Sequence, residues 1–316
     1  MRIVITGPTG AIGLALIQKC IEENNDVIAI CHKGSARIGR IPVNESVKII
    51  EADLDELKNL DKESVGLSID DNADIFYHFA WVGTIGTARN NMPLQIDNIQ
   101  YTIEAVQLAN RLGCKTFIGA GSQAEYGRVE GILHPDTPAF PENGYGMAKL
   151  CAGQMSRMVC ENMGMKHIWT RILSVYGPYD GAATMVTSTI IKLLQGERAG
   201  FTQGEQMWDY LYSADAAEAM YLLGQYGHHG KTYMIGRGQA RQLREYIQQI
   251  AEAVKEYSCQ PIGTLGLGDI PYGEKQVMHL EADISQLQLD TGFYPKVSFE
   301  DGIRETVKVC MEEMNQ

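Results

Sequence analysis

Residues 2–13 read RIVITGPTGAIG, and this stretch decides the fold of the 316-residue chain. Residues 2–5 are expected to form a buried strand, because Arg2 is followed by three apolar residues, and a helix with Leu16 and Cys20 on its apolar face comes next. The glycines between them permit a tight turn, a close backbone approach to a pyrophosphate, and close packing of helix on strand. Because a helix N-terminus attracts phosphate, the stretch predicts a dinucleotide site. The residues expected to contact the cofactor are Thr6, Gly7, Thr9, Gly10, Ala11, Ile12 and Gly13.

Short apolar runs alternate with helical patterns through the first half of the chain. Further strands are expected at 27–30, 47–50, 75–79, 116–120 and 167–173, and helices near 97–112 and 144–162. Apolar strands that alternate with helices predict a doubly wound parallel α/β sheet of the Rossmann type, covered on both faces. Ligands of such sheets bind at the carboxyl ends of the strands.

The rhythm of the pattern changes after about residue 176. Helices are expected at 186–195, 214–226 and 243–257, a strand at 232–235, and a final helix from about residue 299. We therefore expect two domains. Residues 1–175, with a contribution from 209–240, form the dinucleotide-binding domain, and residues 176–208 and 241–316 form a smaller, discontinuous α+β lobe that binds the substrate.

The composition excludes several classes of function. The net charge is -12 and no basic block stands out, so neither nucleic acid nor a membrane surface is an expected partner. No apolar stretch reaches the length of a transmembrane helix, and the first residues lack a signal-peptide pattern. The seven cysteines are scattered without metal-ligand spacing, which favours reduced thiols, a cytoplasmic protein and no metal site.

The end of the second expected strand bears on the choice of cofactor. Residues 29–37 contain no carboxylate for the adenosine ribose, whereas Lys33, Ser35 and Arg37 suit a 2′-phosphate. The sequence therefore favours NADP(H), with NAD(H) as the alternative. Asp53, which follows the third expected strand together with Leu54, is expected at the adenine.

A tyrosine and a lysine four residues apart, Tyr145 and Lys149, lie on one face of an expected helix. Free tyrosine has a pKa of about 10, and a neighbouring ammonium favours the phenolate. Lowering that pKa by ~3 units requires roughly 4 kcal/mol. Ser122 closes the fifth expected strand and would complete a catalytic Ser, Tyr, Lys set.

These features together resemble the extended short-chain dehydrogenase/reductase family of NAD(P)-dependent nucleotide-sugar epimerases, dehydratases and reductases. The matching segments are the glycine turn, His78-Phe79-Ala80, Asp97-Asn98, the Ser122 segment, Tyr145-x-x-x-Lys149, 171–178, 209–215 and 291–295. The resemblance implies that Tyr145 exchanges a proton with the sugar and that Lys149 holds the nicotinamide ribose. It also implies that Ser122 donates a hydrogen bond to the reacting oxygen, and that Phe79 and Ala80 contact the cofactor.

Positions at which the chain departs from the family pattern reduce the number of reactions that the resemblance implies. Dehydratases of the family carry Asp-Glu directly after the position of Ser122, where this chain has Gln123 and Ala124. Glu125 follows and would point to the opposite face if the stretch stays extended, so we do not expect a dehydratase. Ser174 and Trp208 replace an asparagine and an arginine that usually hold the diphosphate. The substrate contacts expected from these comparisons are Trp81, Thr84, Gln123, Arg171, Ser174, Trp208 and Arg237.

The favoured function is NADPH-dependent 4-keto reduction of a nucleoside-diphosphate sugar, and the chain is nearest in look to CDP-linked deoxysugar 4-ketoreductases. An NAD-dependent C4 epimerase is the alternative, and a non-enzymatic NADP-binding regulator is a remote one. The helices near 97–112 and 144–162 form a dimer interface in many relatives, so a homodimer is expected.

Overall fold

The computed structural model describes residues 1–314, and its centre is a parallel sheet of seven strands. The strands run in the order β11-β6-β5-β4-β1-β2-β3, and every neighbouring pair is parallel. Their bounds are β1 (Arg2–Thr6), β2 (Asp26–Cys31), β3 (Val47–Glu51), β4 (Ile75–His78), β5 (Thr116–Ser122), β6 (Lys166–Ile172) and β11 (Thr232–Ile235). The predicted Rossmann-type fold is therefore confirmed.

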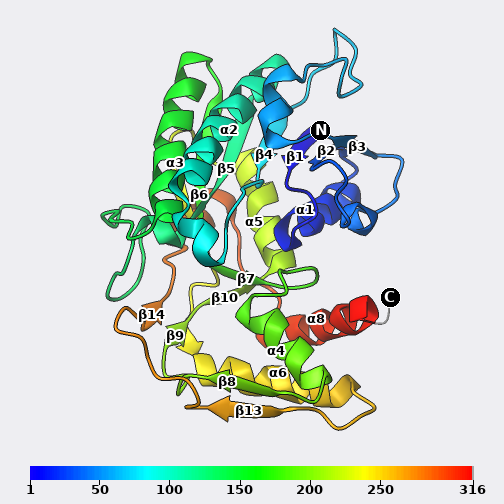
Figure 1. Ribbon diagram of the computed structural model, residues 1–316. Helices are drawn as coiled ribbons and strands as arrows, with labels where there is room; N and C mark the ends of the chain where they lie inside the picture. Colours follow the sequence, from blue (N-terminus) through cyan, green and yellow to red (C-terminus); the bar gives the residue numbers. More distant parts are fainter. Residues whose placement is uncertain (315–316) are drawn as a thin grey trace.

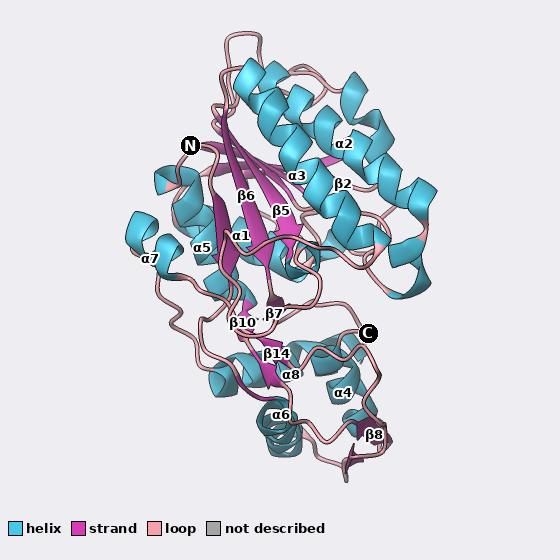
Figure 2. Ribbon diagram, turned by 90° about the vertical axis from the view of Figure 1, so that its left-hand side faces the viewer, coloured by secondary structure: helices cyan, strands magenta, loops and turns pink. Residues whose placement is uncertain are grey.

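Helices cover both faces of this sheet, as Figure 2 shows. On one face lie α1 (Ala11–Glu22), α5 (Ser213–Tyr226) and α7 (Ser285–Thr291), and on the other lie α2 (Met92–Arg111) and α3 (Gly144–Asn162). Alternate residues of β1 point to opposite faces, so Ile3 and Ile5 join the core under α1 and α5, whereas Val4 joins the core under α2. Burial on both sides explains why the strands read as continuous apolar runs.

The second lobe packs three helices around an aromatic core. These are α4 (Met185–Leu194), α6 (Leu243–Tyr257) and α8 (Phe299–Met314), and the rings of Tyr176, Tyr210, Tyr246 and Phe299 pack between them in tilted and edge-to-face contacts. Short strands complete the lobe: β8 (Arg198–Phe201) with β13 (Thr264–Leu267), and β9 (Met207–Trp208) with β12 (Arg241–Gln242) and β14 (His279–Leu280).

A two-stranded ladder joins the two halves. β7 (Ser174–Tyr176) continues from β6 and pairs in parallel with β10 (Tyr210–Tyr212) between the large sheet and the helical lobe (Figure 1). The carboxyl ends of β1, β4 and β5 open toward this junction, and the cavities described below are lined by residues at those ends. The topology thus places loops from distant parts of the chain around one groove.

Two further searches cover the described residues 1–314 alone. None of their helices is both long and apolar enough to cross a membrane. Among the same residues, no group of three or more His, Cys, Asp or Glu side chains is arranged to hold a metal ion.

Candidate active site

The turn after β1 has a shape that requires glycine at two positions. Gly7 has a φ of +69°, and a Cβ there would lie 2.8 Å from the backbone N of Ala80. A Cβ at Gly13 would lie 2.5 Å from the carbonyl O of Gly7. A Cβ at Gly10 would meet only the Gly7 carbonyl O, at 4.0 Å, so this residue faces open space directly before α1. A backbone cradle at a helix N-terminus fits the pyrophosphate of a dinucleotide.

A cavity of about 640 Å³ extends from this turn toward the ends of β2 and β3. Nine of the predicted cofactor residues line it: Thr6, Gly7, Thr9, Gly10, Arg37, Asp53, Leu54, Phe79 and Ala80. Its size and its place beside the glycine turn suit the adenosine half of a dinucleotide.

The donors predicted for a 2′-phosphate are only partly directed at this cavity. The Lys33 ammonium pairs with Glu56, and the Lys33 backbone N–H donates to Oδ1 of Asp53 at 3.2 Å. The Ser35 hydroxyl accepts from the backbone N–H of Arg37 at 3.3 Å. Of the three, Arg37 lines the cavity, and so does Asp53.

A second cavity, of about 290 Å³, brings the three predicted catalytic residues together. Ser122 at the end of β5 lines it with Tyr145 and Lys149 of α3, and so do Ala11, Ile12 and Gly13 of the glycine turn. The α3 helix begins at Gly144 because Asn143 caps it by accepting from the N–H of Gly146 at 2.9 Å. This cap places Tyr145 in the first turn of α3, and Lys149 follows one turn later.

The charges around the tyrosine differ from the expectation. Burial raises the pKa of Tyr145, and the Ser122 hydroxyl and Arg89 lower it only in part. The Lys149 ammonium donates to the carbonyl of Ala120 at 2.6 Å and stands 3.7 Å from the ring centre of Trp81, against 5.8 Å for the ring of Tyr145. Burial lowers the pKa of Lys149 to about 7. In this structure burial outweighs the groups around Tyr145, and the lowering of its pKa by Lys149 stays a prediction for the site with a nicotinamide bound.

Arg89 is a residue that the sequence analysis missed. Its guanidinium lies 4.3 Å from the centre of the Tyr145 ring, and its Nη1 donates to the carbonyl of Thr84 at 3.1 Å. It comes from the loop between β4 and α2, which Asn90 fastens to α3 by accepting from the N–H of Gly144 at 3.0 Å. The sequence of this loop has no periodic pattern. Its length after His78 is the one sequence feature that suggests it could reach the site.

The segment after Ser122 does not stay extended. Residues Gln123–Glu125 form a single 3₁₀ turn, and the Glu125 side chain is fully buried rather than displayed on the opposite face. The expectation for Glu125 is thus corrected, because its carboxylate folds back onto the backbone of Ser122. Gln123 is half-buried at the start of this turn.

The predicted substrate residues divide into two groups. Trp81 and Thr84 line the cavity that holds Tyr145. Arg171 instead forms a buried ion pair with Glu125 at 2.8 Å.

The lobe residues of the second group bond to one another or to backbone. Ser174 accepts a hydrogen bond from the indole N–H of Trp208 at 2.8 Å, and Arg237 donates from Nη1 to the carbonyl of Val297 at 2.7 Å. The structure does not bring these side chains to the cavity of Tyr145.

Comparisons with known proteins agree with this geometry. The sequence model of the NAD dependent epimerase/dehydratase family matches residues 3–236. A Bacillus subtilis protein named as an uncharacterized UDP-glucose epimerase is 25% identical over 319 residues, which cover 97% of this chain and 97% of the relative.

Solved structures show the same fold. The UDP-N-acetylglucosamine 4-epimerase of Methanobrevibacter ruminantium superposes with a TM-score of 0.85 at 22% identity, covering 99% of each chain. The dTDP-glucose 4,6-dehydratase of Streptomyces venezuelae, solved with NAD, gives 0.84 at 19% identity and covers 100% of this chain and 98% of its own.

Proposed function

The chain belongs to the NAD dependent epimerase/dehydratase family, and we propose that it inverts C4 of a nucleoside-diphosphate sugar with a retained NAD. One observation carries the proposal: Ser122, Tyr145 and Lys149 line the same cavity as the glycine turn. A cofactor held at that turn and a sugar beside the tyrosine would therefore meet at one place. In the same proposal, residues 1–175 with 209–240 hold the cofactor, and residues 176–208 with 241–316 hold the sugar nucleotide.

The side chains of the cavity have complementary roles in this reaction. A bound nicotinamide supplies hydride acceptance and return at the sugar carbon. Tyr145 takes the proton of the C4 hydroxyl while the carbon is oxidised, and gives it back when the carbon is reduced from the other face. Ser122 donates a hydrogen bond to the C4 oxygen. Lys149 supplies a positive charge close to the nicotinamide ribose.

Water elimination is not part of the proposal. The positions that carry Asp-Glu in dehydratases hold Gln123 and Ala124 here, and neither is an acid. The next residue, Glu125, is fully buried and bonded to Arg171, so its carboxylate does not line the cavity of Tyr145. Elimination needs an acid and a base at the sugar, and the residues directly after Ser122 supply neither.

The choice of NAD rests on the acidic lining of the larger cavity. Asp53 and Asp55 line it, and Lys33 is already paired with Glu56, so a 2′-phosphate would meet more negative than free positive charge. Arg37 favours a second candidate, in which NADPH reduces a 4-keto sugar. The two candidates share the catalytic side chains and differ in whether the cofactor leaves after each turnover.

A labelling experiment separates the two candidates. The purified protein is incubated with UDP-glucose or dTDP-glucose, and the configuration at C4 is followed by NMR. An epimerase gives the C4 epimer with its original C4 hydrogen and no net change in nicotinamide. A reductase instead transfers deuterium from NADPH labelled at the nicotinamide C4 into a 4-keto sugar.

The same samples also test whether the protein eliminates water from the sugar and which nicotinamide cofactor it binds. Solvent deuterium at C5 would indicate elimination and contradict the exclusion of dehydratase activity. The nucleotide released on denaturation of the purified protein is identified by mass spectrometry, and NAD is expected. Failure of every sugar nucleotide to react with either cofactor would overturn the proposal.

We also propose a homodimer through α2 and α3. Ile96, Met155 and Met158 are exposed apolar side chains on these two helices, whereas Ala105 and Leu108 are buried in the core of the same protomer. Exposed apolar side chains on two adjacent helices suit a self-complementary interface. Light scattering should give twice the chain mass, and Met158→Glu should give the monomer.

A further inference from the structure

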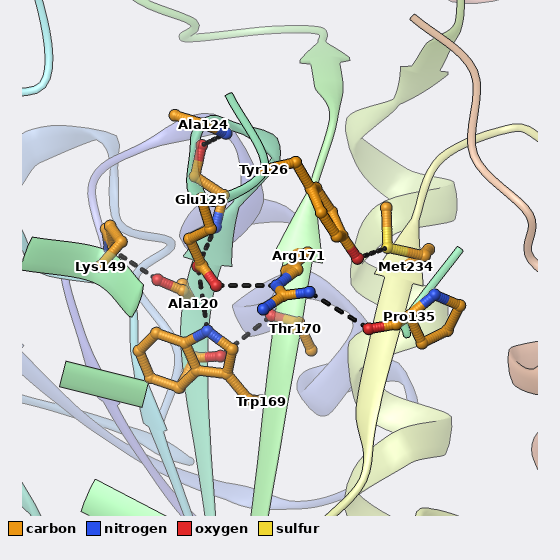
Figure 3. A network of polar contacts seen from close by, with 12 residues as sticks. Ala120, Ala124, Glu125, Tyr126, Pro135, Lys149, Trp169, Thr170, Arg171 and Met234 are labelled. Carbon is orange, nitrogen blue, oxygen red and sulfur yellow. Dashed lines mark hydrogen bonds and ion pairs between the residues drawn. The ribbon is translucent and has the colours of Figure 1, made fainter. Parts of the chain in front are cut away.

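Glu125 is a fully buried carboxylate three residues after Ser122, and the mechanism above does not use it. Its Oε1 accepts from the backbone N–H of Ser122 at 2.8 Å and from the indole N–H of Trp169 at 3.0 Å. Its Oε2 accepts from Nε of Arg171 at 2.8 Å, as Figure 3 shows. A buried charge persists only with such partners, so these three donors fix the position of the carboxylate.

The bond from Glu125 is half of a reciprocal arrangement at Ser122. The Ser122 hydroxyl oxygen accepts from the backbone N–H of Ala124 at 3.2 Å, while the Ser122 N–H is held by Glu125. Together the two bonds close the 3₁₀ turn. Because the hydroxyl oxygen already accepts one bond, its own proton is left to donate into the cavity that Ser122 lines.

Strand β6 holds the other two donors rigidly. In the register of β5 and β6, Gly119 is paired with Trp169 and Gly121 with Arg171. A Cβ at Gly119 or Gly121 would lie 2.2 or 2.3 Å from an atom of the indole, and a Cβ at Gly153 of α3 would lie 2.7 Å from it. The three glycines therefore leave a narrow slot between the sheet and α3, and the flat indole ring of Trp169 fills it.

The Arg171 guanidinium is fixed in a similar way. Its Nη1 donates to the carbonyl of Pro135 at 3.2 Å, and its carbon lies 4.2 Å from the centre of the Tyr126 ring. Both partners belong to the loop that follows Ser122 in the chain. The carboxylate is thus held by two side chains that packing and hydrogen bonds fix in turn. Such support is typical of a preorganised site.

We propose that Glu125 is the positioning residue of Ser122. The indole of Trp169 and the guanidinium of Arg171 fix the carboxylate, and the carboxylate fixes the turn that directs the serine hydroxyl into the cavity. The inference rests on the proposed function in one respect only, namely that the Ser122 hydroxyl meets the reacting oxygen. The coupling between the carboxylate and the Ser122 amide is independent of any substrate.

Trp169→Phe is the main test, because it removes the indole N–H and keeps an aromatic ring in the slot and the ion pair intact. We expect kcat to fall about tenfold with KM within about twofold, a smaller loss than the ~100-fold expected for Ser122→Ala. Glu125→Gln, which keeps the shape of the side chain, should lower kcat in the same direction. Asp290→Asn is the matched control, since the Asp290 side chain is a largely buried carboxylate paired with Lys231, the residue before β11, away from the cavity.

A double-mutant cycle shows whether the effect passes through the serine. In the Ser122→Ala background, Trp169→Phe should lower kcat by less than about twofold, because the group being positioned is already gone. Multiplicative losses in the double variant would overturn the proposal, and so would an equal loss of kcat in Asp290→Asn.

Amide hydrogen exchange tests the geometry without any activity. The peptide that contains Ser122 should exchange about tenfold faster in Trp169→Phe and in Glu125→Gln than in the parent protein, and at the parent rate in Asp290→Asn. Unchanged exchange in both site variants would overturn the proposal. If the parent protein turns over no sugar nucleotide, the proposed function fails, while this measurement still decides the role of Glu125.

Discussion

The two halves of the molecule differ in whether their polar groups face open space or are hydrogen-bonded to other groups of the protein. In the half proposed to hold the cofactor, Gly10 opens on free space at the start of α1, and the Lys149 ammonium lies in the cavity and donates a hydrogen bond to the carbonyl of Ala120. In the substrate lobe, the indole N–H of Trp208 is bonded to Ser174, and the Arg198 guanidinium pairs with Asp269 at 2.7 Å. Under the proposed function, the half that contains the glycine turn offers open groups to a ligand, whereas the lobe would exchange internal bonds for ligand bonds or offer the ligand apolar surface.

The largest effect on kcat is expected from a change at Tyr145. Tyr145→Phe removes the hydroxyl that exchanges the proton and should lower kcat about 10³-fold, because general acid–base groups contribute on this scale. Steady-state kinetics on the sugar nucleotide that reacts measures the loss. Tyr226→Phe is the control, since Tyr226 is an exposed residue at the end of α5. If kcat of Tyr145→Phe lies within tenfold of the parent value, Tyr145 is not the proton-exchanging residue and the contrast between the two halves fails.

The buried side chain of Lys149 predicts a pH effect on stability. Burial lowers the pKa of Lys149 to about 7 in the folded chain, against about 10.4 in the unfolded one. Between these values the unfolded chain binds more protons, so the contribution of Lys149 to stability rises with pH. The difference in unfolding free energy, parent minus Lys149→Met, should increase by about 2 kcal/mol from pH 7 to pH 9. Urea denaturation measures it, and a difference independent of pH would contradict the burial of the charge.

The glycine turn offers a matched pair of smaller changes. Gly10 has a φ of -84°, which any residue adopts, and its Cβ would enter the groove without a clash. Gly10→Ala should therefore fold like the parent and bind NAD about tenfold more weakly, or about 1.4 kcal/mol.

Gly13→Ala would instead place a Cβ 2.5 Å from the Gly7 carbonyl and should lower the melting temperature as well. Calorimetry with NAD and thermal unfolding separate the two effects. Equal affinity in Gly10→Ala and the parent would mean that the cofactor does not approach this turn.

The smallest effect is expected in the lobe. Trp208→Phe loses the hydrogen bond to Ser174 and should lower the free energy of unfolding by about 1 kcal/mol, with KM within about twofold. Ser174→Ala should cost a similar amount, and the double variant little more than either change alone. A KM that rises tenfold with unchanged stability would place the indole on the substrate and remove the contrast between the halves.

The sequence predicted the sheet and the shape of the glycine turn well because both depend on local patterns. Apolar runs mark strands buried on two faces, and the glycines of the first turn answer a steric demand within a few residues. The turn at Gln123–Glu125 was missed because it depends on a carboxylate bonded to β6, more than forty residues later in the chain. Arg89 and the indole over Lys149 were missed for the same reason, since loop side chains meet α3 only after the sheet has formed.

The three tryptophans of the chain lie in three different parts of the molecule. Trp81 covers the ammonium of Lys149 in the cofactor groove, Trp169 lies behind Ser122 in its glycine slot, and Trp208 belongs to the lobe. Each indole can therefore serve as a built-in fluorescent reporter of its own layer. Variants that keep a single tryptophan would show separately, in time-resolved emission, whether a dinucleotide reaches the groove, whether the surroundings of Trp169 change, and whether a sugar nucleotide alters the surroundings of Trp208.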